Sequence, residues 1–347
     1  MVSSSPKSKI RKNLKIGKIH IDRPLILAPM EDVTDMPFRL VCKKLGADIM
    51  YTEFVNSDGL VRNNKKTFEK MRFLEEERTF GIQIYGGDEN AMEGAARLAD
   101  SLHPDLIDIN CGCWVKQVAG RGAGAGLLKD LPRMERLVSN VVKATNIPVT
   151  VKTRLGWDEH SIKIIEVAKM LEGIGVQGLT IHCRTRSQGH NGDPDYSWIP
   201  KIKQVVSMPI FVNGSLVEPK QIKEVFEDTG CDGVMIGRGA IDNPWIFADT
   251  KHYFQTGELT PKRTLADRID KCIELLTLSV ERKGEKRAVI EMRKFYIGYL
   301  KGEANAAKLR NFLMQFYEAR PIIDTLLSVK EKGFIEEEKF LPAHAAA

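Results

Sequence analysis

The chain has 347 residues, of which 43% are hydrophobic and 28% are charged, so it has room for one large globular domain and a smaller one. No apolar run approaches the roughly 18 residues of a membrane span, and the first residues lack the apolar segment of a secretory signal. Six cysteines are scattered along the chain, which excludes a disulfide-rich scaffold and predicts a cytoplasmic protein without membrane contact.

The net charge of +6 is too small to identify a nucleic-acid partner by itself, but the basic residues are unevenly distributed. Six Lys and Arg residues precede the first acid, Asp22, and residues 262–310 hold 13 basic against 7 acidic side chains. Two interpretations remain open, a solvated surface with a basic terminus or an electrostatic surface that binds a polyanion.

Short apolar runs alternate with amphipathic stretches from residue 24 onward. The runs lie at residues 24–30, 49–54, 80–86, 106–112, 148–154, 178–184, 209–215 and 233–239. Each ends in Gly, Pro or polar residues, as buried parallel strands do, and helical patterns such as 88–100 and 160–172 separate them. Eight such units predict an α/β fold, a (β/α)8 TIM barrel. The alternative, a doubly wound sheet, normally carries G-x-G-x-x-G after its first strand, where this chain has A-P-M-E-D.

Beyond about residue 261 the pattern becomes helical, for example over residues 265–279 and 306–318, and this part carries the basic surplus. We therefore predict a C-terminal all-helical domain after the barrel. The expected divisions are a basic N-terminal segment at 1–18, the catalytic barrel at 19–255, a helical RNA-binding domain at 260–335 and a tail at 336–347.

Polar side chains follow all eight predicted strands. Because the carboxyl ends of barrel strands form the active-site mouth, these residues are candidates for a shared site. They are Glu31, Glu53, Gln83, Asn110 to Cys113, Lys152, Arg154, His182, Arg184, Asn213, Gly237 and Arg238. The last two strand ends, V-N-G-S and I-G-R-G-A-I, are glycine-rich and stand where many barrels bind a phosphate group. We expect a phosphate-bearing cofactor there.

The stretch D-I-N-C-G-C-W at residues 108–114 carries two cysteines that need a role. A zinc site is disfavoured because no second pair of ligands stands nearby at the usual spacing. A redox pair is disfavoured because C-x-C is short and closes a strand. We expect no metal ion.

Nine motifs occur together in one order along residues 15 to 325. They are L-A-P-M-E-D-V-T-D-M-P-F-R (27–39), Q-I-Y-G (83–86), D-I-N-C-G-C (108–113), G-R-G-A-G-A-G-L-L (120–128), V-K-T-R-L-G (151–156), H-C-R-T-R-S-Q-G (182–189), V-N-G-S (212–215), I-G-R-G-A-I-D-N-P-W-I-F (236–247) and M-R-K-F-Y-I-G-Y-L-K-G (292–302). In this combination the chain resembles the tRNA-dihydrouridine synthases, most closely the bacterial DusB-like branch.

The resemblance implies an FMN-bearing barrel that reduces the C5=C6 bond of uridine in tRNA to 5,6-dihydrouridine, with NADPH as the reductant. Flavin N5 delivers hydride to C6, and Cys113 is implied as the acid that protonates C5. A thiol suits this role because its ordinary pKa of about 8.5 keeps it protonated at neutral pH. Cys111 is then a packing residue.

The other implied roles fall into two groups. The cofactor-binding residues are Pro29, Met30, Glu31, Gln83, Lys152, His182, Asn213, Gly214, Ser215, Gly237 and Arg238. The substrate-binding residues are Asn110, Arg154, Arg184, Arg293 and Lys294. The helical domain, together with Lys116 and Arg121, is expected to bind the RNA backbone, and the protein is expected to be a monomer.

The chain departs from the family pattern at three positions. Trp114 stands where the family usually has Pro, Ser215 where it has Asp, and Phe295 where it has His. Trp114 either packs against its loop or stacks on a base. The alternative functions are dihydrouridine synthesis on ribosomal RNA, a small-molecule flavin reductase of the dihydroorotate dehydrogenase type, and a non-catalytic RNA-binding protein.

Overall fold

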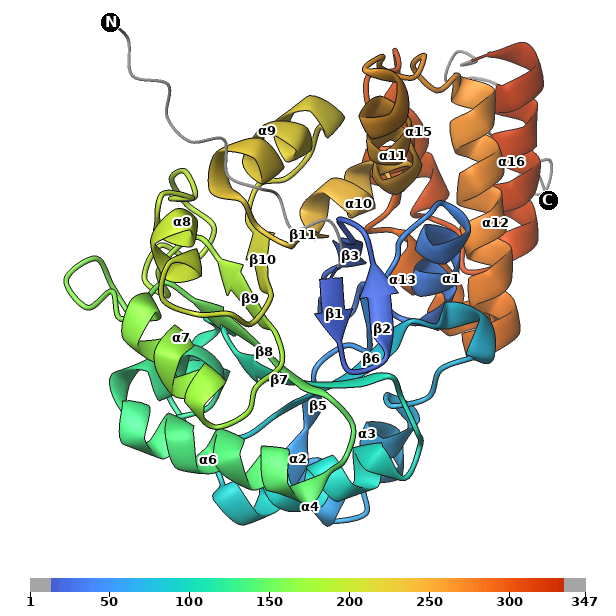
Figure 1. Cartoon of the computed structure of the whole chain (residues 1–347). Helices are drawn as coiled ribbons and strands as arrows, with labels where there is room; N and C mark the ends of the chain where they lie inside the picture. The colour runs from blue at the N-terminus through green and yellow to red at the C-terminus, as the bar shows by residue number, and fades with distance from the viewer. Residues whose placement is uncertain (1–13, 334–347) are drawn as a thin grey trace, which may run out of the picture.

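The computed structural model describes residues 14–333 and contains a barrel of eight parallel strands (Figure 1). The strands are β3 (Leu25–Leu27), β4 (Met50–Tyr51), β6 (Phe80–Tyr85), β7 (Leu106–Cys111), β8 (Val149–Arg154), β9 (Leu179–His182), β10 (Ile210–Asn213) and β11 (Gly233–Ile236). The short β5 (Val55–Asn56) pairs with the end of β6. The Leu27 N–H donates to the Ile49 carbonyl at 2.9 Å and joins the first strand to the second. The predicted (β/α)8 TIM barrel is confirmed, and each of its eight strands lies inside one of the eight predicted runs, whereas β5 lies outside them.

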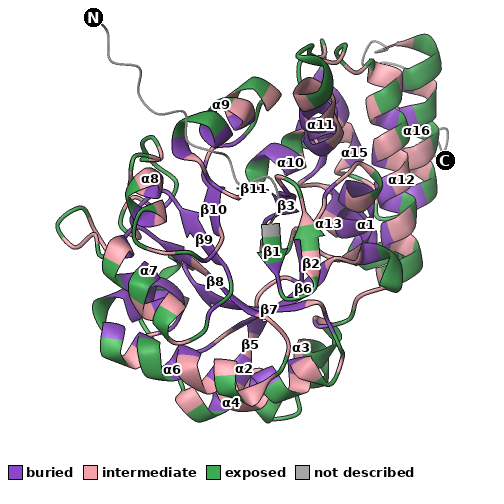
Figure 2. Cartoon of the chain, viewed as in Figure 1, coloured by how far each residue is buried: buried purple, intermediate pink, exposed green. Residues whose placement is uncertain are grey.

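Helices cover the outside of the barrel, so the strands are buried on both faces (Figure 2). They are α1 (Met36–Lys44), α2 (Ser57–Val61), α3 (Lys65–Glu69), α4 (Glu89–Asp100), α5 (Lys116–Ala119), α6 (Leu131–Ala144), α7 (Ile164–Gly173), α8 (Trp198–Lys203), α9 (Pro219–Thr229), α10 (Arg238–Asp242) and α11 (Ile246–Thr256). The aspartates 35, 88 and 130 precede α1, α4 and α6 and accept hydrogen bonds from first-turn N–H groups. These N-caps explain where the three helices begin.

A hairpin of β1 (Leu14–Ile16) and β2 (Ile19–Ile21) fills the amino-terminal end of the barrel (Figure 1). Ile16 is 1% exposed and belongs to an apolar cluster with Leu106, Phe211 and Met235 from three barrel strands. The hairpin crosses the predicted division between residues 18 and 19. The rest of the predicted basic segment, residues 1–13, and the predicted tail at 336–347 lie outside the described residues.

The C-terminal region is helical, as predicted. It consists of α12 (Leu265–Lys283), α13 (Glu285–Met292), α14 (Tyr296–Tyr299), α15 (Ala306–Leu313) and α16 (Ala319–Lys332). It packs on α1, where the rings of Phe38 and Phe295 stack with centroids 5.0 Å apart. Lys283 pairs with Asp35 at the start of α1, and both regions share one hydrophobic core. Phe295 is buried in this contact.

None of the helices between residues 14 and 333 combines the length and the apolar character that crossing a bilayer requires.

The N-cap of α4 provides a test of the local folding argument. Asp88 Oδ1 accepts from the Ala91 N–H at 2.8 Å, and Asp88→Ala leaves that donor without its cap. We expect the free energy of unfolding, measured by urea titration, to fall by about 1 kcal/mol. Asp88→Asn is the matched control, because its amide oxygen can still accept the bond. An equal loss in both variants would contradict the cap as the cause.

Candidate active site

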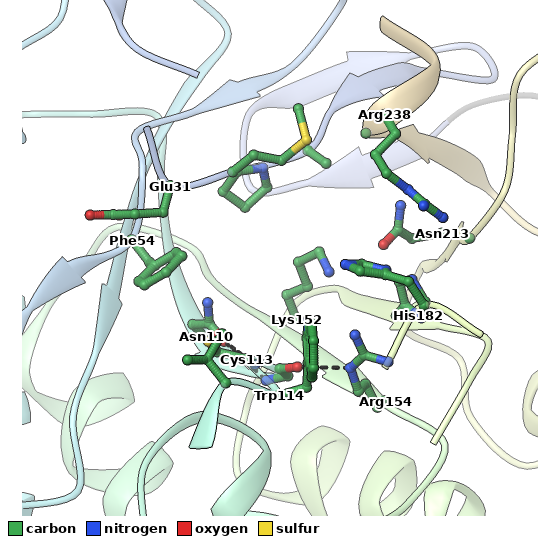
Figure 3. A pocket seen from close by; sticks show the side chains of 18 of the residues that line it. Glu31, Phe54, Asn110, Cys113, Trp114, Lys152, Arg154, His182, Asn213 and Arg238 are labelled. Atoms are coloured by element: carbon green, nitrogen blue, oxygen red, sulfur yellow. Dashed lines mark hydrogen bonds between the residues drawn. The ribbon is translucent and has the colours of Figure 1, made fainter. Parts of the chain in front are cut away.

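A cavity of about 270 Å³ opens at the carboxyl ends of the barrel strands (Figure 3). Thirteen of the predicted site residues line it, and they come from six strand ends. They are Pro29, Met30, Glu31, Asn110, Cys113, Lys152, Arg154, His182, Asn213, Gly214, Ser215, Gly237 and Arg238. In Figure 3, Asn110 and Cys113 lie across the cavity from Asn213 and Arg238, with Lys152 between them.

A chain of hydrogen bonds below the cavity fixes the end of β7. The Asn110 side-chain oxygen accepts from the N–H groups of Gly112 and Cys113, at 3.0 and 2.9 Å. Its amide nitrogen donates to Gln83 Oε1, and Gln83 in turn donates to Asp108 at 2.6 Å. Gln83 is fully buried, and its effect on the cavity is to hold the Asn110 side chain in place. This network holds the backbone of Cys113 in one position.

Of the six cysteines, Cys113 alone is not buried, and it lines the cavity (Figure 3). Burial raises the pKa of Cys113, although the Val115 N–H and the charge of Arg154 oppose this shift. The thiol therefore stays protonated at neutral pH. Cys111, two residues earlier, is 0% exposed and packs in the core.

The glycine-rich run after Cys113 packs against the Cys113 backbone. This segment forms α5 and a 3-10 helix, η2 (Gly124–Lys129). A Cβ atom on Gly124, whose φ is +54°, would lie 2.9 Å from the Cys113 carbonyl oxygen. Glycine is required there because a side chain would push the Cys113 backbone out of place.

Cationic and imidazole groups surround the cavity. Lys152 makes no hydrogen bond or ion pair with any described residue, and burial together with the charge of Arg154 lowers its pKa to about 8. Burial and the charges of Arg154 and Lys152 also lower the pKa of His182 far below its usual range, so this imidazole is neutral. The His182 Nδ1 atom is buried without a partner among the described residues. Lys152 and His182 are both free to bind a ligand.

Arg154 is held by the backbone. Its guanidinium donates to the carbonyls of Gly112, Thr185 and Gly189 at 2.8 to 3.0 Å. These bonds tie the loop after β7 to the loop after β9. Arg154 therefore lines the cavity mainly as a fixed positive charge.

The ends of β10 and β11 form the opposite wall. The backbone N–H groups of the following residues donate to no acceptor among the described residues: Gly214, Ser215, Arg238 and Gly239. Gly214 has a φ of +131° and Ser215 a φ of +48°, which turns the chain sharply after β10. Arg238 is exposed and has a free guanidinium within the described part of the chain. Free N–H groups next to an arginine are well suited to bind a phosphate group.

Of the residues to which the resemblance assigns a cofactor or substrate role, four do not line the cavity: Gln83, Arg184, Arg293 and Lys294. Two further strand-end candidates, Glu53 and Cys111, do not line it either. Arg184 is buried, donates to the Gly192 carbonyl and to Ser215 Oγ, and keeps Nη1 unpartnered. Arg293 lies over the Tyr317 ring in the helical region. Lys294 donates to the Asp32 carbonyl and so contacts the segment after β3.

A family model described as "Dihydrouridine synthase (Dus)" matches residues 26–331. The chain belongs to the dihydrouridine synthase family. Among curated relatives, tRNA-dihydrouridine synthase B of Pseudomonas aeruginosa is 38% identical over 87% of this chain and 90% of its own length. A probable tRNA-dihydrouridine synthase of Rickettsia conorii is 33% identical over 92% and 95%.

Solved structures resemble this chain in fold alone. A variant of NCR from Zymomonas mobilis has a TM-score of 0.51 at 14% identity, over 74% of this chain and 94% of that one. The 6-hydroxypseudooxynicotine amine oxidase of Pseudomonas geniculata has a TM-score of 0.57 at 12% identity, over 78% and 52%.

Several residues that line the cavity were not predicted from the sequence. Phe54 follows β4 and His190 lies in the loop after β9, and both line the mouth. Phe54 has an apolar side chain, and an apolar residue at a strand end does not stand out from the core residues of the strand in the sequence. His190 lies eight residues beyond His182, and no pattern in the sequence marks it.

Proposed function

We propose that this protein reduces the C5=C6 bond of uridine in tRNA to 5,6-dihydrouridine, with FMN as cofactor and NADPH as reductant. The observation that carries the proposal is the position of Cys113. Its protonated, accessible thiol shares one cavity with the unpartnered Lys152 and with free N–H groups that suit a phosphate. Protonation of a carbon atom beside a bound flavin requires a positioned acid, a cation near the flavin and a site for the flavin phosphate.

The residues present fit FMN. The N–H groups of Gly214 and Ser215, with Gly237 and Arg238 at the end of the neighbouring strand β11, would hold the phosphate. Pro29, Met30 and Glu31 would line the isoalloxazine, and Lys152 and His182 would bind its polar edge. The buried, unpartnered His182 Nδ1 supports this assignment, because a buried polar atom without a partner is costly. When bound and reduced by NADPH, FMN would supply the hydride that adds to C6 of uracil.

Cys113 would supply the proton. Its S–H bond breaks as the proton passes to C5, and the C5=C6 bond becomes single, which leaves a thiolate on Cys113. The charges of Arg154 and Lys152 both favour this thiolate, since they oppose the rise in the pKa of Cys113 that burial causes. Because Cys113 is partly exposed, solvent can return the proton. Asn110 would position the thiol through its hydrogen bond to the Cys113 N–H.

RNA is the proposed partner because of the basic residues on the helical region and at the rim. Lys116 and Arg121 are exposed in the segment after Cys113, and Arg293 and Lys294 remain candidate RNA contacts. Arg184 is buried, so it is not proposed as a contact to the RNA backbone. The target base has to leave its stack to enter the cavity, at a cost of a few kcal/mol. Backbone contacts that release counterions would offset this cost, so binding should weaken with salt.

The decisive experiment maps dihydrouridine in total RNA from cells with and without the gene. Loss of the modification at defined tRNA positions is the expected result. Loss in ribosomal RNA instead would transfer the activity to that substrate. Dihydrouridine unchanged at every site, in cells whose purified protein carries FMN, would favour a small-molecule reductase. A colourless protein that binds RNA would favour a non-catalytic role.

A further inference from the structure

Trp114 follows the proposed proton donor directly and lies at the rim of the cavity (Figure 3). Its side chain is 39% exposed, whereas the other three tryptophans are buried or half-buried. Gly189 lies against the six-membered ring, where an added Cβ atom would come within 3.3 Å. The indole therefore rests on the loop after β9 and keeps a large part of its surface open.

Packing alone does not explain Trp114. The loop after β9 is already fastened by Arg154, which donates to the carbonyls of Thr185 and Gly189. The preceding Cys113 is held by Asn110 and by the close contact with Gly124. Since both neighbouring segments have their own restraints, the exposed indole is available to a ligand.

His190 forms a corner with Trp114. The two rings are 5.4 Å apart between centroids, at an interplanar angle of 79°, and both residues are exposed at the cavity mouth. Partial desolvation and then the charges of Arg238 and Arg154 lower the pKa of His190 to about 4, so the ring is neutral at pH 7. The buried His182 lies 6.0 Å further inward. The rings of His182, His190 and Trp114 thus form a series that runs from the inner wall of the cavity to its rim.

We infer that Trp114, supported by His190, is a stacking platform for the nucleobase adjacent to the target uridine in the RNA chain. The inference rests on the proposed function. The target base must reach Cys113, and the residue after Cys113 is then the nearest surface for the base of a neighbouring nucleotide. Stacking on an indole suits a position whose base varies, because every base has a π-face. Trp114 is a substrate-positioning residue in this assignment.

Two substitutions separate stacking from packing. Trp114→Leu keeps an apolar side chain against Gly189 but has no π-face, and Trp114→Phe keeps a smaller π-face. On an unmodified tRNA transcript, we expect Trp114→Leu to raise KM about ten- to hundredfold, the range of one base–aromatic stack. Its kcat should fall far less, and Trp114→Phe should recover most of the affinity. Equal KM values for wild type and Trp114→Leu, or equal damage in both variants, would overturn the inference.

An abasic transcript makes the test independent of folding. In two transcripts the base on the 5′ or on the 3′ side of the target uridine is removed. One of them should raise KM for the wild type and abolish its advantage over Trp114→Leu, because the stacking partner is gone. If the advantage persists on both transcripts, the platform does not bind a neighbouring base. If the wild type reduces no uridine at all, the proposed function itself fails, and the two failures are distinguishable.

Discussion

Replacing Cys113 with alanine is expected to abolish dihydrouridine formation on tRNA while FMN stays bound. Cys113 is the only one of the six cysteines that reaches the cavity, so no other thiol can take its place. Partial burial raises its pKa and keeps the thiol protonated. Loss of a positioned general acid lowers turnover by about 10² to 10⁴-fold. Single-turnover assays that start from the reduced enzyme measure this step directly, and flavin absorbance checks that the cofactor is retained.

Cys111→Ala is the matched control for this prediction. Cys111 lies two residues away and is fully buried, so its loss should leave the reaction intact and cost only packing free energy. A melting temperature recorded for both variants separates lost chemistry from lost folding. Equal loss of turnover in the two variants would refute the assignment of the acid.

Lys152→Met is the second substitution with a large expected effect. The ammonium group has no partner among the described residues and lies in the centre of the cavity, where it would stabilise negative charge on a reduced cofactor (Figure 3). Removing one such preorganised charge costs about 10² to 10³-fold in turnover. Rapid-mixing measurements of flavin oxidation by tRNA would show the loss. Lys201→Met, an exposed lysine on α8, is the control and should behave as wild type.

Lys152 also predicts the pH dependence. Its pKa is lowered to about 8 by burial and by Arg154, so it is charged below that pH and neutral above it. Wild-type turnover should therefore fall as the pH rises through about 8, and the alkaline limb should vanish in Lys152→Met. If the limb persists unchanged in this variant, Lys152 does not provide the charge.

The sequence predicted the strands well because they are buried on both faces and so form apolar runs with clear ends. Thirteen site residues could also be predicted to lie together, because the parallel strands of a barrel all end at one rim. The β1–β2 hairpin was missed because lysines at positions 15 and 18 obscure its apolar face. The binding of Arg154 to three carbonyls could not be predicted, because backbone acceptors leave no mark in the sequence.

The hairpin that fills the amino-terminal end of the barrel has a kinetic consequence. Since Ile16 and its neighbours occupy that end, the described residues leave the carboxyl-terminal mouth as the route to Cys113 and Lys152. The nicotinamide of NADPH and the uracil of tRNA would then compete for one entrance. In the proposed reaction the two substrates must take turns, with oxidised nucleotide leaving before RNA enters. High NADPH concentrations should therefore inhibit competitively with respect to tRNA.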